Sequence, residues 1–269
     1  MDSGTTACLC GVWGSSAGDV FAAGSDGTIV RYDGASWLPM DSGTPYTLAD
    51  VWGTSGSDVF AVGEAGRILH YDGTEWTWMS SGTGEALSGV WGSSGSDVFA
   101  VGYDLTILHY DGAGWSVMNH SPTDGLPYHH GFNAVWGSSG SDVFAVGWDR
   151  FFAPAWHYDG AAWDSMTSGA TQDLEGVWGR APDDVFAVGA WGQIVHYDRT
   201  AWQAMESGTD NTLYDVWGDR GRHVFVVGAE GTILHYLGAP LAVYLPLVEK
   251  GTMVQTVAPA RTDSSSNSW

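Results

Sequence analysis

Histidine and aspartate recur along this sequence at a fixed spacing, and both side chains are common in proton transfer and metal binding. A His precedes a Tyr in five places, at His70, His109, His157, His196 and His235. An Asp opens the preceding apolar segment in five copies, at Asp19, Asp58, Asp97, Asp142 and Asp184. Such a set suits metal or proton chemistry. Because each residue occurs once per copy, we expect the His to satisfy buried polar groups and the Asp to accept turn backbone N–H groups.

A repeat of roughly forty residues carries these side chains. Its Val-Trp-Gly tripeptide recurs six times, with the tryptophan at Trp13, Trp52, Trp91, Trp136, Trp178 and Trp217. Each copy reads L-x-x-V-W-G, D-V-F-A-V-G, I-L-H-Y-D-G and W-x-x-M, four short segments separated by turn residues. These segments predict four β-strands, and the Asp-Gly step predicts a tight hairpin between the third and fourth.

Both alternating sets of side chains in the second segment are apolar, Val59 with Ala61 and Phe60 with Val62, so its strand must be covered on both faces. Sheets stacked between sister sheets around a ring meet this need. The sequence therefore predicts an all-β fold: a six-bladed β-propeller over residues 1–250, with four antiparallel strands per blade. Residues 251–269 are rich in Ser and Thr, and we predict a flexible tail there.

The repeat also carries a resemblance to a known class of proteins. The strings V-W-G-S-S-G-S-D-V-F-A-V-G and I-L-H-Y-D-G-x-x-W resemble the tandem repeats of bacterial, often secreted or surface-associated β-propellers. The likeness extends over residues 1–244. It implies the propeller architecture and an extracellular or cell-surface location, and it implies hardly any chemistry.

Both ends of the sequence bear on how the predicted ring closes. Residues 1–5, Met-Asp-Ser-Gly-Thr, repeat the wording of residues 40–44, which follow a fourth strand. Residues 241–248 occupy the repeat position of the fourth strand in the last copy. We therefore predict that they form the outer strand of blade 6. The two segments compete for the closing position, and a closed ring is expected from either.

Composition excludes several classes of partner. The formal net charge is −22 with a single lysine, so nucleic acid and anionic membrane surfaces would be repelled. No apolar run is long enough to insert in a bilayer. Cys8 and Cys10 lack further ligands at zinc-type spacing, and no third ligand is fixed for His129 and His130. We predict neither a metal nor a cofactor.

Function is best sought where the copies differ, because the shared fold explains the shared residues. Two insertions stand out, at residues 119–132 and within residues 148–156. Links from a fourth strand to the next first strand emerge on the same face as loops between second and third strands, so the insertions should be neighbours. The predicted ligand-binding residues are Tyr128, His129, His130, Phe132, Trp148, Asp149, Arg150, Phe151, Phe152 and Trp156, with Tyr46, Tyr103 and Trp191 as secondary candidates.

These aromatic loops predict a non-enzymatic recognition or scaffold module that binds a protein or a carbohydrate on this face. A multivalent lectin with one site per blade is the first alternative. A glycosidase-like propeller enzyme is the second, and it is disfavoured because the arginines are scattered and no catalytic motif is present. A loop mini-core formed by Phe151, Phe152 and Trp156 is the structural alternative to a binding site.

Overall fold

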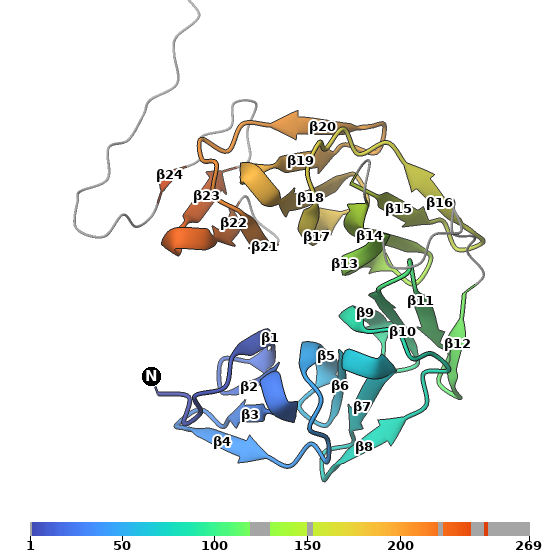
Figure 1. The fold of residues 1–269 in the computed structure, drawn as a ribbon, viewed down its shortest axis with the longest axis vertical. Helices are drawn as coiled ribbons and strands as arrows, with labels where there is room; N and C mark the ends of the chain where they lie inside the picture. Colours follow the sequence, from blue (N-terminus) through green and yellow to red (C-terminus); the bar gives the residue numbers. More distant parts are fainter. Residues whose placement is uncertain (1, 119–129, 150–152, 220–222, 238–244, 247–269) are drawn as a thin grey trace, which may run out of the picture.

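The fold is the predicted six-bladed β-propeller, built from six antiparallel four-stranded sheets (Figure 1). The computed structural model describes residues 2–118, 130–149, 153–219, 223–237 and 245–246. In every sheet the strands follow in chain order, and first strands of successive sheets contact one another around the ring. The fourth strands lie at the outer rim.

The strand bounds follow the repeat closely. Blades 1 and 2 comprise β1 Leu9–Ser16, β2 Asp19–Gly24, β3 Ile29–Tyr32, β4 Trp37–Met40, β5 Leu48–Ser55, β6 Asp58–Gly63, β7 Arg67–Tyr71 and β8 Trp76–Met79. Blades 3 and 4 comprise β9 Leu87–Ser94, β10 Asp97–Gly102, β11 Ile107–Tyr110, β12 Trp115–Val117, β13 His130–Ser139, β14 Asp142–Asp149, β15 Ala155–Tyr158 and β16 Trp163–Met166. Blades 5 and 6 comprise β17 Leu174–Ala181, β18 Asp184–Gly189, β19 Ile194–Tyr197, β20 Trp202–Met205, β21 Leu213–Gly218, β22 His223–Gly228, β23 Ile233–Leu237 and β24 Leu245–Pro246.

Short 3-10 turns join the second and third strands of four blades. They are η1 Ser25–Gly27, η2 Glu64–Gly66, η3 Ala190–Gly192 and η4 Ala229–Gly231. Each turn begins next to the segment that links the fourth strand of the preceding blade to the first strand of its own blade. The N–H of Glu64, for example, donates to the carbonyl of Thr47. The links and these loops therefore share one face, as predicted, and we call it the upper face.

The core consists of apolar layers between successive blades. In β6, Val59 and Ala61 pack toward blade 1, whereas Phe60 and Val62 pack toward blade 3. All four side chains are at most 1% exposed, which confirms that the second strand is covered on both faces.

Two contacts repeat at each of these layers. The Val-Trp-Gly tryptophan of one blade lies over the glycine of the next, so a methyl group at Gly92 would come within 2.6 Å of the Trp52 ring. The phenylalanine of the second strand meets the Tyr and Trp of the next blade, and the Phe60 ring centroid lies 5.7 Å from Tyr110 and 6.2 Å from Trp115. A bulky ring on one blade thus requires a small residue on its neighbour.

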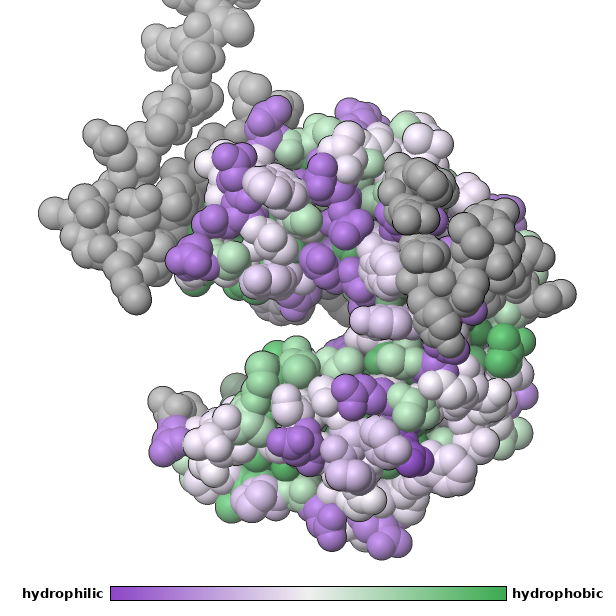
Figure 2. Space-filling model, viewed as in Figure 1, coloured by the Kyte–Doolittle hydropathy of each residue, from purple (hydrophilic) through white to green (hydrophobic). Residues whose placement is uncertain are grey.

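The expectation of a closed ring is wrong for the described residues. Figure 1 shows blade 1 and blade 6 separated, and Figure 2 shows a slot between them with hydrophobic residues along the blade 1 side. Val12 of β1 is 68% exposed, whereas Val51 at the same repeat position of blade 2 is 3% exposed. Within the predicted outer strand 241–248, Leu245–Pro246 pairs with β23 and completes blade 6. The predicted tail 251–269 lies outside the described residues.

Candidate functional site

The repeated histidines and aspartates pair within blades 2 to 5, whereas His235 of blade 6 contacts His223. His70 Nε2 lies 2.7 Å from Asp58 Oδ1, and the other Asp58 oxygen accepts a 2.5 Å hydrogen bond from Thr54 Oγ1. His109 with Asp97, His157 with Asp142 and His196 with Asp184 make the same contact at 2.7–2.8 Å. In blade 1, Arg31 Nε takes the place of the imidazole, 2.7 Å from Asp19.

The order of these contacts argues against nucleophilic catalysis. In a Ser-His-Asp triad the histidine stands between the hydroxyl and the carboxylate, so that it can accept the hydroxyl proton. Here the carboxylate of Asp58 stands between Thr54 and His70. The imidazole cannot take the hydroxyl proton from that position, and the set instead fixes three strands to one another.

One expectation about the aspartates needs correction. These carboxylates bond His, Arg, Ser and Thr side chains rather than the backbone N–H groups of turns. The turn-capping role belongs to the Asp-Gly aspartates: Asp72 Oδ1 accepts hydrogen bonds from the N–H groups of Thr74 and Glu75. These bonds, together with one from the Thr74 hydroxyl, lower the pKa of Asp72 to about 2.

The described ends of the two insertions, residues 130–132 and 148–149, meet in blade 4. The strands β13 and β14 extend further than their counterparts and pair His130 with Asp149 and Gly131 with Trp148. The extension reaches blade 3, where Gly131 forms a β-bridge with Tyr103. Tyr128, His129, Arg150, Phe151 and Phe152 lie outside the described residues.

Three predicted ligand-binding residues belong to the interior instead. Phe132 is 0% exposed and Trp156 is 8% exposed, and both pack in the layer between blades 3 and 4. His130 is also buried, and its Nε2 lies 3.2 Å from Asp104 Oδ1. These side chains support the extended hairpin and are not available to a ligand, so their assignment as contact residues is corrected.

The remaining aromatic residues of this region lie at the surface. Tyr103 is 43% exposed, and its ring meets that of Trp148 edge to face, with centroids 5.7 Å apart. Trp148 in turn lies over Gly131, where an added methyl group would meet the indole at 3.1 Å. The pair is therefore held in place by two strands and one loop. It presents an ordered aromatic edge to solvent.

Trp191, a secondary candidate, is the most exposed large hydrophobic residue described, at 71%. It occupies the left-handed region, with φ 56° and ψ 34°, where Asp26, Ala65 and Glu230 stand in the matching turns. A tryptophan in this conformation is uncommon and costs backbone energy. Trp191, Gly192 and Glu206 line a shallow hollow of about 430 Å³.

A further aromatic cluster on the upper, outer corner of blade 2 includes one predicted residue and two that the sequence did not reveal. The Arg67 guanidinium stacks 4.6 Å from the ring of Tyr46, which is 38% exposed, and 6.0 Å from that of Trp78, which is 60% exposed. Arg67 Nε is buried and has no hydrogen-bond partner among the described atoms. The available signal was Trp78 itself, a second tryptophan where other copies have Pro39, Val117 or Ser165.

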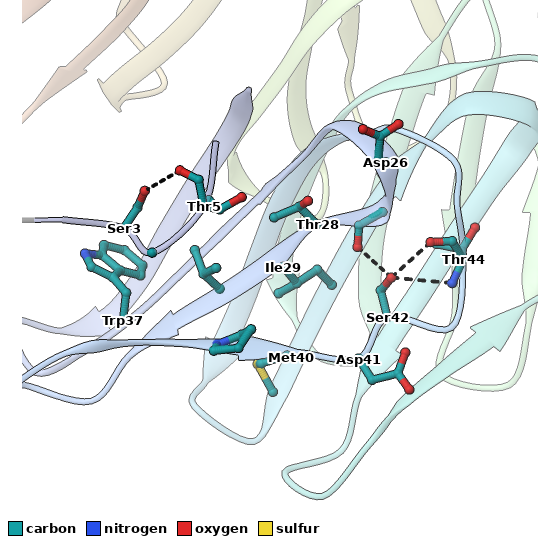
Figure 3. Close-up of a pocket in the computed structure, with 14 residues that line it drawn as sticks. Ser3, Thr5, Asp26, Thr28, Ile29, Trp37, Met40, Asp41, Ser42 and Thr44 are labelled. Carbon is teal, nitrogen blue, oxygen red and sulfur yellow. Dashed lines mark hydrogen bonds between the residues drawn. The ribbon is translucent and has the colours of Figure 1, made fainter. Parts of the chain in front are cut away.

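The hollow in blade 1 has the same place in the repeat as the one beside Trp191 (Figure 3). It measures about 390 Å³ and lies between the η1 turn and the link after β4. Ser42 Oγ donates to the carbonyl of Gly27 at 2.6 Å and lies against Thr44. Because these polar groups already bond within the blade, we assign the hollow a structural role.

Carboxylates near the ring centre are poorly solvated. Burial raises the pKa of Asp50 to about 7, although its oxygens accept hydrogen bonds from the N–H groups of Val90 and Val51. Burial also raises the pKa of Asp215, and the charge of Asp215 adds to the shift at Asp50. Burial and the neighbouring Asp173 raise the pKa of Glu175.

Other kinds of site receive no support from the described parts of the chain. No group of three or more His, Cys, Asp or Glu side chains there is arranged to hold a metal ion. None of the helices described is both long and apolar enough for a bilayer crossing.

Comparisons with known proteins place the chain by its fold. No family model matches the sequence, and no significant match is found among curated proteins. Among solved structures, YCF48 from Cyanidioschyzon merolae aligns with a TM-score of 0.70 at 14% identity, covering 91% of this chain and 87% of that one. The RRP9 WD40 repeats align with a TM-score of 0.70 at 12% identity, covering 87% and 77% of the two chains. At these identities the likeness establishes the propeller fold alone.

Proposed function

We propose that this propeller is a non-enzymatic recognition module that binds a protein segment on its upper face. The observation that carries the proposal is the set of aromatic side chains held at the surface of that face, above all Tyr103 with Trp148 and, separately, Trp191. Rigid aromatic residues at the surface are the usual anchors of protein interfaces, because they bury much area and lose little side-chain entropy.

The charge of the molecule favours a basic partner. The net charge is −22, and the upper-face turns add the carboxylates of Asp26, Glu64 and Glu230. A segment that carries Lys or Arg would be attracted to this face and would pair with carboxylates around the aromatic anchors. Its cationic groups would also stack on the tryptophan rings.

The arrangement of the polar side chains favours binding over catalysis. Each repeated carboxylate already bonds side chains of its own blade, as Asp58 does with Thr54 and His70 and as Asp184 does with Arg180 and His196. Such groups are positioned to stabilise strands rather than to exchange protons with a substrate. A carbohydrate ligand remains the alternative, because a tryptophan beside a carboxylate, as at Trp191 and Glu206, also suits a sugar ring.

A binding screen distinguishes these ligands. The intact chain would be tested against an array of peptides of graded charge and against a glycan array. We expect Lys- or Arg-rich peptides to bind, and we expect Tyr103→Ala with Trp148→Ala, or Trp191→Ala, to weaken that binding by about tenfold or more, as loss of an interface anchor does.

A control substitution and two outcomes make the test decisive. Leu38→Ala removes a side chain that is 48% exposed on the outer strand of blade 1, and it should leave peptide affinity unchanged. Glycan binding without peptide binding would replace the proposal with the lectin alternative. Peptide binding that survives all the aromatic substitutions would remove the upper face from consideration.

A further inference from the structure

The last blade carries interblade contact groups that meet no following blade among the described residues. Trp178 of blade 5 lies over Gly218 of blade 6, but Trp217, the equivalent tryptophan of blade 6, is 60% exposed. Phe186 meets the next blade's Tyr236, whereas the ring contacts of Phe225 are with His223 and His235 of its own blade. This face has the shape that blades 1 to 5 present to a following blade.

The first blade carries the matching receptor groups, which meet no preceding blade in the part of the chain that the structure describes. A methyl group at Gly14 would meet Val20, Asp19 and Ser16 of its own blade and no tryptophan. Tyr32 and Trp37, at the positions of Tyr71 and Trp76, form a ring contact with each other and with no phenylalanine. The two walls of the slot thus offer the two halves of the interface that the other blades share.

The residues before β1 argue against direct closure of blade 6 on blade 1. Residues 2–5 match residues 41–44, which follow the fourth strand of one blade and lead into the next. In blade 2 the equivalent tail lies on the upper-face turn, so that a methyl group at Gly66 would meet the Thr83 carbonyl at 2.2 Å. At Gly231 of blade 6 such a group would meet no described residue within 4 Å.

Blade 6 also has a fourth strand of its own. Leu245–Pro246 pairs with β23 and fills the outer position of that sheet. The outer position of blade 6 is therefore held by β24 and not by residues 2–5.

We propose that a seventh four-stranded sheet of this same repeat fills the slot between blade 6 and blade 1. Trp217 and Phe225 would pack on its glycine and its Tyr and Trp, and its own Trp and Phe would pack on Gly14 and on Tyr32 with Trp37. Both apolar walls of the slot would be buried by the contact already made between the other blades. Propellers close with four to eight blades, so a seventh is within the range of the architecture.

The test adds such a sheet to the full chain. Residues 45–78, which form most of blade 2, would be joined directly before Met1, so that residues 1–5 complete the added copy. Access to the slot would be read from maleimide labelling of Val12→Cys, with Cys8 and Cys10 replaced by Ser. We expect labelling to slow by about tenfold or more and the Tm to rise by about 5 °C or more in the extended chain.

Matched variants separate slot filling from general stabilisation. Val117→Cys, 56% exposed on the outer strand of blade 3, should label equally fast in both chains. Gly14→Ala should remove most of the gain in Tm in the extended chain, because the added tryptophan would meet the new methyl group. A second extension with residues 84–117 of blade 3 repeats the test if the first fails to fold.

Three results would overturn the proposal. The first is slow maleimide labelling of Val12→Cys in the chain without the added copy. That result would mean that blade 6 or a second molecule covers blade 1. Another is unchanged labelling in both extended chains. The third is failure of both extensions to fold while the original chain folds. None of these results depends on whether the upper face binds peptides.

Discussion

At the scale of single residues, the repeated polar groups stabilise the blades. Asp58 joins Thr54 of β5 to His70 of β7 across the strand between them. The imidazole also lies against Phe60, with ring centroids 4.5 Å apart. Spacing in the sequence predicted that His and Asp serve each blade, but only the structure shows that the carboxylate occupies the middle of the set.

Replacement of the central carboxylate should therefore lower stability without affecting recognition. Asp58→Ala removes both hydrogen bonds and leaves His70 and Thr54 without this partner, and we expect a loss of about 1–2 kcal/mol because the pair is partly solvated. Thermal and urea denaturation measure the loss. The exposed Asp164→Ala serves as the control. A peptide affinity that falls in step with Asp58→Ala would instead assign Asp58 to the binding site.

Asp50 illustrates a charged residue at a position where three copies have glycine and one has alanine. Its pKa of about 7 exceeds the value of about 3.9 expected in the unfolded chain. Between these pH values the unfolded state loses the proton first, so the free energy of unfolding should fall as pH rises from about 4 to 7 and then level off.

Asp50→Asn should remove much of that fall. The amide keeps one acceptor for the N–H groups of Val51 and Val90 and carries no charge. We expect the variant to gain stability over the original chain at pH 8 and to gain little or none at pH 5. Urea denaturation across this range is the measurement, with Asp164→Asn as the control. Parallel pH profiles for Asp50→Asn and the original chain would contradict the assignment.

At the scale of elements, glycine and tryptophan set the contact between neighbouring blades. The repeat predicts a glycine after each tryptophan, but the sequence does not say that the two meet across different blades. Gly92 lies under Trp52 of the preceding blade, whereas Gly14 has no tryptophan above it.

These two glycines form a matched pair for testing the contact. Gly92→Ala places a methyl group 2.6 Å from the Trp52 ring and should cost about 1–3 kcal/mol through overpacking. Gly14→Ala meets Val20 at 3.0 Å in its own blade and should cost less than about 1 kcal/mol. Equal losses of Tm in the two variants would show that the tryptophan contact does not limit the packing.

The extended hairpin of blade 4 shows where element-level prediction failed. Phe132 pairs with Gly147 as Leu48 pairs with Gly63, so it fills the first apolar position of the repeat. Trp156 pairs with Ala145 as Leu69 pairs with Ala61. Alignment of these residues to the consensus would have placed both in the core. Because both residues lie next to the insertions in the sequence, they were predicted to be loop residues.

At the scale of the whole molecule, the ends of the ring determine its stability. Five layers between blades are buried, while the outer faces of blades 1 and 6 remain open to solvent in the slot (Figure 2). In repeat architectures the terminal units have the fewest neighbours and unfold most readily. Blade 6 is therefore expected to be sensitive to any loss at its edge.

Removal of the last strand tests this expectation. A chain that ends at Leu237 lacks β24, so β23 loses the partner that pairs with Leu234 and His235. We expect the Tm to fall by about 5 °C, whereas a chain that ends at residue 249 keeps β24 and should retain its Tm. Equal melting of the shorter chain and the original would show that β24 adds no stability.

The sequence by itself determined the repeat, the four strands of each blade, the turns and the face on which the insertions meet. These features depend on local turn chemistry and on the alternation of side chains along single strands. Both patterns are repeated in every copy of the repeat. Tertiary structure alone decided that Arg67 stacks between Tyr46 and Trp78 and that six blades leave a slot. Those outcomes depend on how one sheet is rotated against the next, and this angle arises from side chains that are distant in the sequence.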